Sequence, residues 1–109
     1  MELSGECKIL KIYISEESRY KGHNLYHALV LKFKELGMAG VTVTRGIEGF
    51  GQGKRLSSTS LLDISFNLPV IVEVVDVPEK MDRAVEAAKE MVREGLMILT
   101  NVEVIKYGG

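Results

Sequence analysis

Apolar and polar residues first alternate along this chain and then recur at helical spacing. The alternation over residues 7–14 predicts a strand with Leu10, Ile12 and Ile14 on one face and Ile9, Lys11 and Tyr13 on the other. After a polar loop over 15–22, apolar residues return every three or four positions, as one helix face requires: Leu25, Ala28, Leu29, Phe33 and Leu36. Asn24 is a suitable N-cap and Gly37 a suitable C′ residue, so we expect a helix between them.

The second half of the chain repeats this layout. Residues 41–44 are β-branched and predict a strand, and residues 68–75 predict another in which Pro69 fits the start better than the middle. Pro78 opens a second helix, expected to stop at Gly95. Its apolar face carries Met81, Ala84, Val85, Ala88 and Val92. Two short strands over 97–99 and 102–106 complete the series.

The order βαββαβ predicts an α+β, ferredoxin-like sandwich. We expect a four-stranded antiparallel sheet with two helices on one face, a long loop between the second and third strands, and residues 1–109 as a single domain. Valines should line the face beneath the helices: Val41, Val43, Val70, Val72, Val74, Val102 and Val104. The opposite face would also be apolar, because Ile9, Tyr13, Ile71, Val75 and Ile105 outnumber Lys11 and Glu73 there. A second apolar face predicts self-association into a closed ring of copies.

Composition narrows the function classes. The formal net charge is -1 with acids and bases interspersed, so no basic stripe indicates nucleic-acid binding. No apolar run reaches the ~18 residues of a membrane span, and no secretory leader is recognisable, so we expect a cytoplasmic protein. The single cysteine, Cys7, excludes an intramolecular disulfide.

The most distinctive segment is rich in glycine. Gly46, Gly49, Gly51 and Gly53 lead to Lys54 and Arg55, and they open a polar, strandless connection that runs to about residue 63. Such long connections usually bind something or move. Glycines let a backbone approach a ligand closely and turn its N–H groups toward an anion.

Neither conventional nucleotide motif is present in this segment. A Walker loop needs glycine five residues before the Gly-Lys pair, and Glu48 stands there; the dinucleotide pattern fails because no helix follows. The alternative is a flexible hairpin tip in which the glycines only satisfy turns. Phe50, between two glycines, is either an anchor for the loop's base or a wall for a flat ligand.

Catalytic patterns are sparse. The acids Glu48, Asp63 and Glu73 have no paired spacing, and nothing near the serines of residues 57–60 would activate a nucleophile. An enzyme is not supported. His23 and His27 are spaced i, i+4, so they would share a helix face that can bind metal, although no third ligand is evident. We predict no metal site.

The order of these motifs resembles the PII signalling proteins, and most closely their PII-like branch of uncharacterised role. The resemblance rests on Gly40-Val41-Thr42-Val43-Thr44, then Gly49-Phe50-Gly51-Gln52, then Leu68-Pro69 before a Val/Ile/Glu strand, with Pro78 and Gly95 further on. It spans nearly the whole chain. It implies a homotrimer whose sheets face inward, with an adenine nucleotide (ADP or ATP) bound in the clefts between subunits. The 48–63 loop would change conformation to engage a target protein; some members of the branch accompany membrane ion transporters.

The resemblance also implies the site residues. It places the loop base beside the nucleotide: Arg45, Gly46, Gly49, Phe50, Gly51 and Gln52. Thr42, Thr44 and Glu73 fall near the adenine and ribose, and Gly95 and Lys106 fall near the phosphates. One departure matters. The family's second phosphate loop usually reads Gly-Asp-Gly-Lys, whereas this chain has Arg93-Glu94-Gly95-Leu96, so Arg45, Lys54 or Arg55 would have to supply the missing charge.

A second hypothesis is a metal-responsive trimer resembling the divalent-cation tolerance proteins. Its ligands would be His23 and His27 with Glu17 or Glu48. A small ferredoxin-like enzyme is a third possibility, but fold analogy supplies no acid, base or nucleophile.

Overall fold

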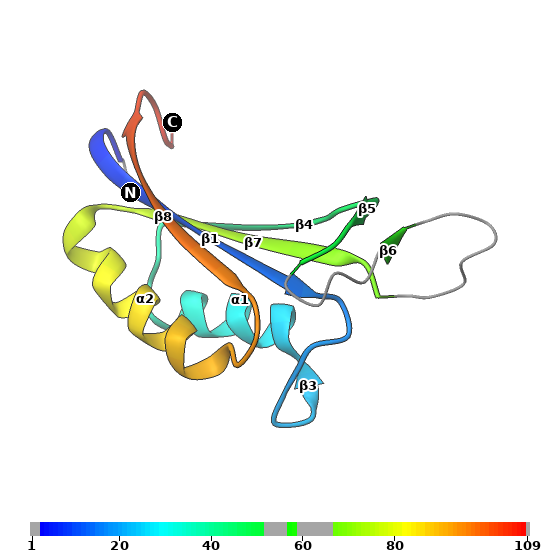
Figure 1. Cartoon of the computed structure of the whole chain (residues 1–109). Helices are drawn as coiled ribbons and strands as arrows, with labels where there is room; N and C mark the ends of the chain where they lie inside the picture. Colours follow the sequence, from blue (N-terminus) through cyan, green and yellow to red (C-terminus); the bar gives the residue numbers. More distant parts are fainter. Residues whose placement is uncertain (1–2, 52–56, 59–66, 109) are drawn as a thin grey trace.

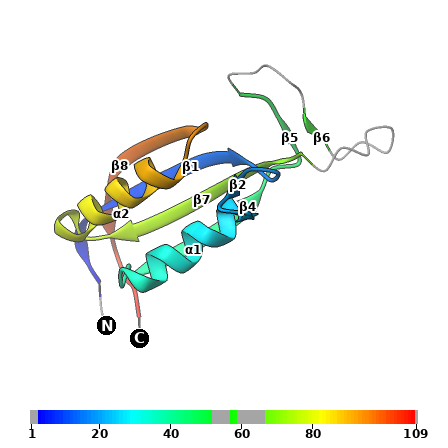
Figure 2. The ribbon, with the colours of Figure 1, turned by 90° about the horizontal axis from the view of Figure 1, so that it is seen from below.

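Two helices cover one face of a four-stranded antiparallel sheet and leave the other face without a helix (Figure 1). The computed structural model describes residues 3–51, 57–58 and 67–108 of the chain. The strands are β1 (Gly5–Ser15), β4 (Gly40–Arg45), β7 (Pro69–Asp76) and β8 (Leu96–Val104), in the order β4-β7-β1-β8. The helices are α1 (Leu25–Glu35) and α2 (Pro78–Met91), which lie side by side along the sheet (Figure 2). The predicted ferredoxin-like α+β fold is confirmed.

The core forms where the helices meet the two central strands. Alternate residues of β1 and β7 face the helices and are buried, and they pack against the apolar stripes of α1 and α2: Leu10, Ile12, Ile14, Val70, Val72, Val74, Leu29, Phe33, Met81, Ala84 and Ala88. The period-2 and helical patterns therefore identified the correct faces of all four elements. Val41 packs partly against this core, but Val43 stays exposed because β4 is an edge strand. The prediction for Val102 and Val104 is wrong: they pair with Cys7 and Gly5, so alternation puts them on the face away from the helices.

Helix α1 has the capping hydrogen bonds expected from the sequence at its C-terminus but not at its N-terminus. Gly37 adopts a left-handed φ of 75°, and its N–H donates to the carbonyl of Lys34 at 3.1 Å while the Met38 N–H donates to Phe33 at 3.0 Å. This pair of bonds is the Schellman motif that a glycine at C′ predicts. Asn24 occupies the N-cap as expected, but its side chain makes no capping hydrogen bond to the helix.

Several predicted boundaries are wrong. The two short strands over 97–106 are one continuous strand, β8, because Thr100 and Asn101 pair with β1 instead of breaking the ladder. That strand ends at Val104, so Ile105 and Lys106 lie beyond it. Helix α2 ends at Met91, and a turn over 93–95 precedes β8.

Two loops expected to lack strands contain short ladders. β2 (Arg19–Tyr20) pairs with β3 (His23–Asn24), and β5 (Glu48–Gly49) pairs with β6 (Ser57–Ser58). His23 is therefore in a hairpin strand, not on the helix that carries His27, and the predicted shared helix face is wrong.

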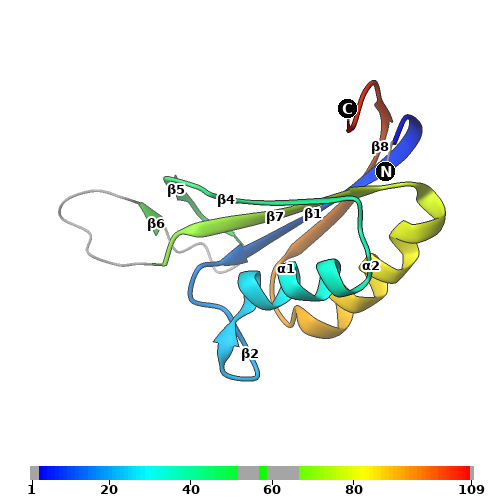
Figure 3. The same ribbon diagram turned by 180° about the vertical axis from the view of Figure 1, so that it is seen from behind.

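The sheet face opposite the helices is apolar, as predicted. We call it the outer face; Figures 1 and 3 show both helices on its far side. Cross-strand pairs join Ile9 to Val75 and Tyr13 to Ile71, and β8 extends the surface with exposed Leu96 and Ile98. Lys11 and Glu73 form an ion pair at 3.6 Å within this otherwise apolar area.

Candidate functional site

Strand β4 ends in the glycine-rich segment, whose first residues form a corner of the molecule. We call Arg45, Gly46, Gly49, Phe50 and Gly51 the glycine corner. The Gly46 N–H donates to the carbonyl of Pro69 at 2.7 Å, which continues the β4–β7 ladder by one residue. The structure thus brings five of the predicted nucleotide-site residues together at one end of the sheet. Gln52, Lys54 and Arg55 lie outside the described residues.

Gly46 and Gly51 in the corner differ in how much space a side chain would have. A Cβ at Gly46 would lie 2.8 Å from Cγ of Pro69, so close packing alone requires glycine there. A Cβ at Gly51 would meet no atom of the described residues within 4 Å. The described part of the chain therefore gives Gly51 no packing role, and its backbone is available there for a ligand contact.

Charge at the corner comes from Arg45. Its guanidinium forms an ion pair with the Glu16 carboxylate, and its side chain remains 60% exposed. The Glu16 N–H in turn donates to the carbonyl of Leu68 at 2.8 Å, which fixes the backbone that carries this acid. An incoming phosphate would compete with Glu16 for Arg45, and guanidinium groups bind both anions by paired hydrogen bonds.

Phe50 does not anchor the base of the loop. Its side chain is 67% exposed, so it does not pack into the described part of the chain. Of the two interpretations of this ring, the anchor is excluded for the described residues, and the wall for a flat ligand stays a prediction. Stacking on an exposed aromatic ring is a common way to hold a base.

Polar residues reach the outer face next to the corner. Thr42 pairs with Glu73 and Thr44 pairs with Ile71, and both threonines are exposed on the edge strand. Alternation places Thr42, Thr44 and Glu73 on one face, so the predicted adenine- and ribose-contacting residues lie on a common surface. Lys11 neutralises Glu73 there.

The two remaining predicted residues lie away from the corner. Gly95 is at the same end of the sheet but beside β8, the opposite edge strand, and a Cβ there would lie 2.7 Å from the carbonyl oxygen of Tyr13. Lys106 follows the far end of β8, which has 9 residues. At about 3.3 Å per residue, Lys106 is roughly 30 Å along the sheet from the end that carries the glycine corner. One chain therefore does not bring Lys106 to its own corner.

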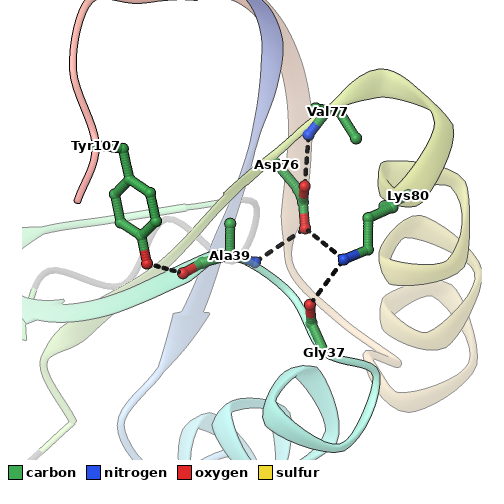
Figure 4. A network of polar contacts seen from close by, with 6 residues as sticks. All are labelled: Gly37, Ala39, Asp76, Val77, Lys80 and Tyr107. Carbon is green, nitrogen blue, oxygen red and sulfur yellow. Dashed lines mark hydrogen bonds and ion pairs between the residues drawn. The ribbon is translucent and has the colours of Figure 1, made fainter. Parts of the chain in front are cut away.

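Sequence reasoning missed a polar network at that far end. The Asp76 side chain is 0% exposed and accepts hydrogen bonds from the N–H groups of Val77 (2.7 Å) and Ala39 (2.9 Å) (Figure 4). The Lys80 ammonium lies 3.8 Å from Asp76 and donates to the carbonyl of Gly37 at 3.1 Å. The only sequence signal was that Asp76 continues the buried alternation of β7. Partners in distant segments could not be foreseen.

Burial also affects Cys7. Loss of solvent raises the pKa of its thiol, and the nearby carboxylates of Asp76, Glu79 and Glu6 act in the same direction. The thiol is therefore protonated and unreactive at neutral pH.

A metal centre has little support in the described part of the chain. No group of three or more His, Cys, Asp or Glu side chains lies close enough there to hold an ion. His23 and His27 both border a hollow of about 450 Å³ between the β2–β3 hairpin and the helices. Neither Glu17 nor Glu48 borders it. Among the described residues, neither helix has the length and hydropathy to span a membrane.

Comparison with known proteins identifies the family of this chain. The DUF190 family, described as "Uncharacterized ACR", matches residues 7–104. A UPF0166 protein of Aquifex aeolicus is 39% identical over 98 residues, which cover 90% of this chain and 92% of that protein.

Solved structures extend the likeness to the fold. CPII from Thiomonas intermedia, bound to ADP and bicarbonate, has a TM-score of 0.67 at 13% identity, covering 95% of this chain and 91% of its own. A putative PII-like signaling protein from Thermus thermophilus has a TM-score of 0.66 at 20% identity, covering 93% and 91%. CutA1 from Oryza sativa has a TM-score of 0.60 at 11% identity, covering 97% and 84%.

Proposed function

Since the chain belongs to the DUF190 (UPF0166) family and has the fold of PII-like proteins, we propose that it is a regulatory protein that binds an adenine nucleotide. It acts as a homotrimer, carries no catalytic activity of its own, and works in the cytoplasm. The nucleotide binds between copies, at the glycine corner of one and the last residues of another. The 48–63 loop transmits the result to a target protein, for example a membrane transporter.

One observation carries this proposal: the glycine corner is half of a site. It offers an exposed ring at Phe50 and the backbone of Gly51, and Thr42, Thr44 and Glu73 form a polar strip on the outer face of the adjoining strands. Arg45 adds a cation at the end of β4, on the opposite face of the sheet from that strip. These are the elements that a base, a ribose and a phosphate need. A ligand of that size would leave much of its surface in water on a single copy, whereas small-molecule sites usually enclose most of their ligand. A second copy would complete the enclosure.

The outer face explains how a second copy would be held. Its apolar pairs Ile9–Val75 and Tyr13–Ile71, with exposed Leu96 and Ile98, form a surface that monomers rarely leave in water. Lys11 and Glu73, its charged side chains among the described residues, form an ion pair, so neither would enter an interface as an unpaired charge.

Regulation follows from the ligand's preference between loop conformations. A nucleotide shifts the 48–63 loop only as far as its affinity differs between the two states. No reaction is needed for such a signal.

Isothermal titration calorimetry with ATP, ADP, AMP and cyclic AMP tests the proposal. We expect binding of at least one of them, and no heat or thermal shift with any would refute it. Gly51→Ala and Gly51→Val form a graded pair, because an added Cβ meets no atom of the described residues within 4 Å and valine adds two further carbons. Affinity should fall with side-chain size while sedimentation shows an unchanged oligomer. Gln52→Ala should weaken binding about fivefold, the effect of one lost hydrogen bond of about 1 kcal/mol.

The metal-responsive hypothesis has the CutA1 fold likeness in its favour and only two histidines near each other. Equilibrium dialysis with copper and zinc separates the two functions. Metal bound with no nucleotide affinity would favour that second hypothesis.

A further inference from the structure

The segment that follows β8 presents an apolar residue and a cation to solvent. Ile105 is 82% exposed, the largest exposed fraction among the large apolar side chains of the described residues. Lys106 beside it is exposed and takes part in no ion pair within the described part of the chain. On a single copy, the described residues give the Lys106 ammonium no ion-pair partner and leave most of the Ile105 side chain in water.

This segment is nevertheless anchored. The Tyr107 hydroxyl donates a hydrogen bond of 2.5 Å to the carbonyl of Ala39, 68 positions earlier in the chain (Figure 4). Ala39 is itself fixed, because its N–H donates to the buried carboxylate of Asp76 at 2.9 Å. Tyr107 is thus tied to a rigid point of the fold where β7, α2 and the α1–β4 connection meet.

The anchor acts on Lys106 through the backbone. Val104, the last residue of β8, pairs with Gly5, and Tyr107 follows three residues later. Ile105 and Lys106 are held between these two fixed points. Without the tyrosine hydroxyl, the chain after Val104 would have one attachment and many more conformations.

We propose that Tyr107 is a positioning residue, whose bond to Ala39 holds Lys106 ready for the phosphates of a nucleotide bound at the glycine corner of a neighbouring copy. This inference rests on the function proposed above. The neighbouring copy is required because Lys106 and its own glycine corner lie at opposite ends of the sheet.

The expected size of the effect follows from the conformations that are lost. If binding requires the anchored form of the segment, the apparent affinity falls by the fraction of molecules that retain it. We expect Tyr107→Phe to weaken ADP binding by about three- to tenfold on that basis. Lys106→Ala should weaken it by about tenfold or more, because a charge-assisted bond is lost outright.

Calorimetry on the full chain, with ADP and with adenosine, tests the inference. We would compare the wild type, Tyr107→Phe, Lys106→Ala and the double variant, with Tyr20→Phe on the β2–β3 hairpin as the matched loss of a tyrosine hydroxyl. Tyr107→Phe should weaken ADP and leave adenosine unchanged, and the double variant should bind ADP within about twofold of Lys106→Ala, since the two changes act on one contact. Hydrogen exchange of amides 105–108 should become faster in Tyr107→Phe.

Each contrary result has a distinct meaning. Wild-type protein that binds no nucleotide would overturn both the proposed function and this inference. Wild-type binding with no effect of Tyr107→Phe would overturn the inference alone. Equal weakening of ADP and adenosine, or effects that add in the double variant, would show a general structural role for Tyr107 instead of an action through Lys106.

Discussion

Replacing Asp76 by alanine should destabilise the protein more than any single polar substitution on its surface. The carboxylate is 0% exposed, and it links the start of α2 to the α1–β4 connection by accepting N–H bonds from Val77 and Ala39. Alanine removes both acceptors at once. The two backbone donors are then left facing a small space where the side chain was.

The magnitude can be worked out from these contacts. A buried donor left without a partner costs about 1–3 kcal/mol. Ala39 and Val77 are themselves half-buried, so water reaches them in part and the lower end applies, about 1 kcal/mol each. The Lys80 ion pair adds little, because its nitrogen lies 3.8 Å away and the lysine side chain is 39% exposed. The expected loss is therefore about 2–3 kcal/mol in the free energy of unfolding.

Urea and thermal unfolding would measure this loss. Each kcal/mol corresponds to about 4–8 °C for a domain near this size, so we expect the melting temperature to fall by about 8–24 °C. Wild type and variant must be compared at one protein concentration, because the proposed association would contribute to apparent stability. Asp76→Asn should lose nearly as much, since its amide group presents donors to at least one N–H.

Asp82→Ala is the matched control, because Asp82 is an exposed acid on the same helix. Its stability should change by no more than about 0.5 kcal/mol. If Asp76→Ala were as stable as Asp82→Ala, the carboxylate would not stabilise the junction and the reasoning would be refuted. In that case, hydrogen exchange at the Ala39 and Val77 amides would show which of the two N–H groups is not protected by its bond to Asp76.

Three further predictions concern packing, ionisation and association. Gly95→Ala should lower the unfolding free energy by about 1–3 kcal/mol in urea titrations, because its Cβ would lie 2.7 Å from the Tyr13 carbonyl oxygen. The raised pKa of Cys7 means that the folded state keeps its thiol proton longer than the unfolded state, so stability should decline as pH rises above about 8.5, and Cys7→Ala should flatten that decline in unfolding midpoints. Ile98→Asp should shift sedimentation at micromolar concentration toward monomer, because it places a charge on the apolar outer face.

Controls for these predictions come from the same chain. Gly51→Ala should leave stability unchanged, since its Cβ would meet no atom within 4 Å in the described part of the chain. Leu31→Asp changes an exposed apolar residue on α1 and should leave the oligomer intact. If both aspartate variants dissociated the oligomer, or neither did, the outer face would not be the association surface. A pH profile unaffected by Cys7→Ala would remove the thiol as the cause.

Strong local periodicity explains why most of the fold could be predicted. The alternation in β1 and β7 and the helical spacing in α1 and α2 arise because one face of each element is buried in the core. These patterns therefore predicted both the type of each element and its buried face. The prediction failed over 97–106, where polar Thr100 and Asn101 suggested a break. On the edge strand β8 those side chains stay exposed, so the ladder continues without burying them.

The candidate site could be predicted only in part. Glycine spacing and the flanking strand identified the glycine corner, where Gly46, Gly49 and Gly51 follow one another in the chain. The Asp76 network was missed because its bonds join segments 37 and 68 positions apart, and no short pattern records such pairs.

The sequence by itself determined the βαββαβ order, the buried faces of β1, β7, α1 and α2, and an apolar outer face, because burial leaves a period of 2 in strands and of 3.6 in helices. Only the tertiary structure decided that Gly46 and Gly95 lie at one end of the sheet and Lys106 at the other. That separation depends on strand order and register, which come from contacts between distant segments. It is also why the proposed nucleotide site needs a second copy of the chain.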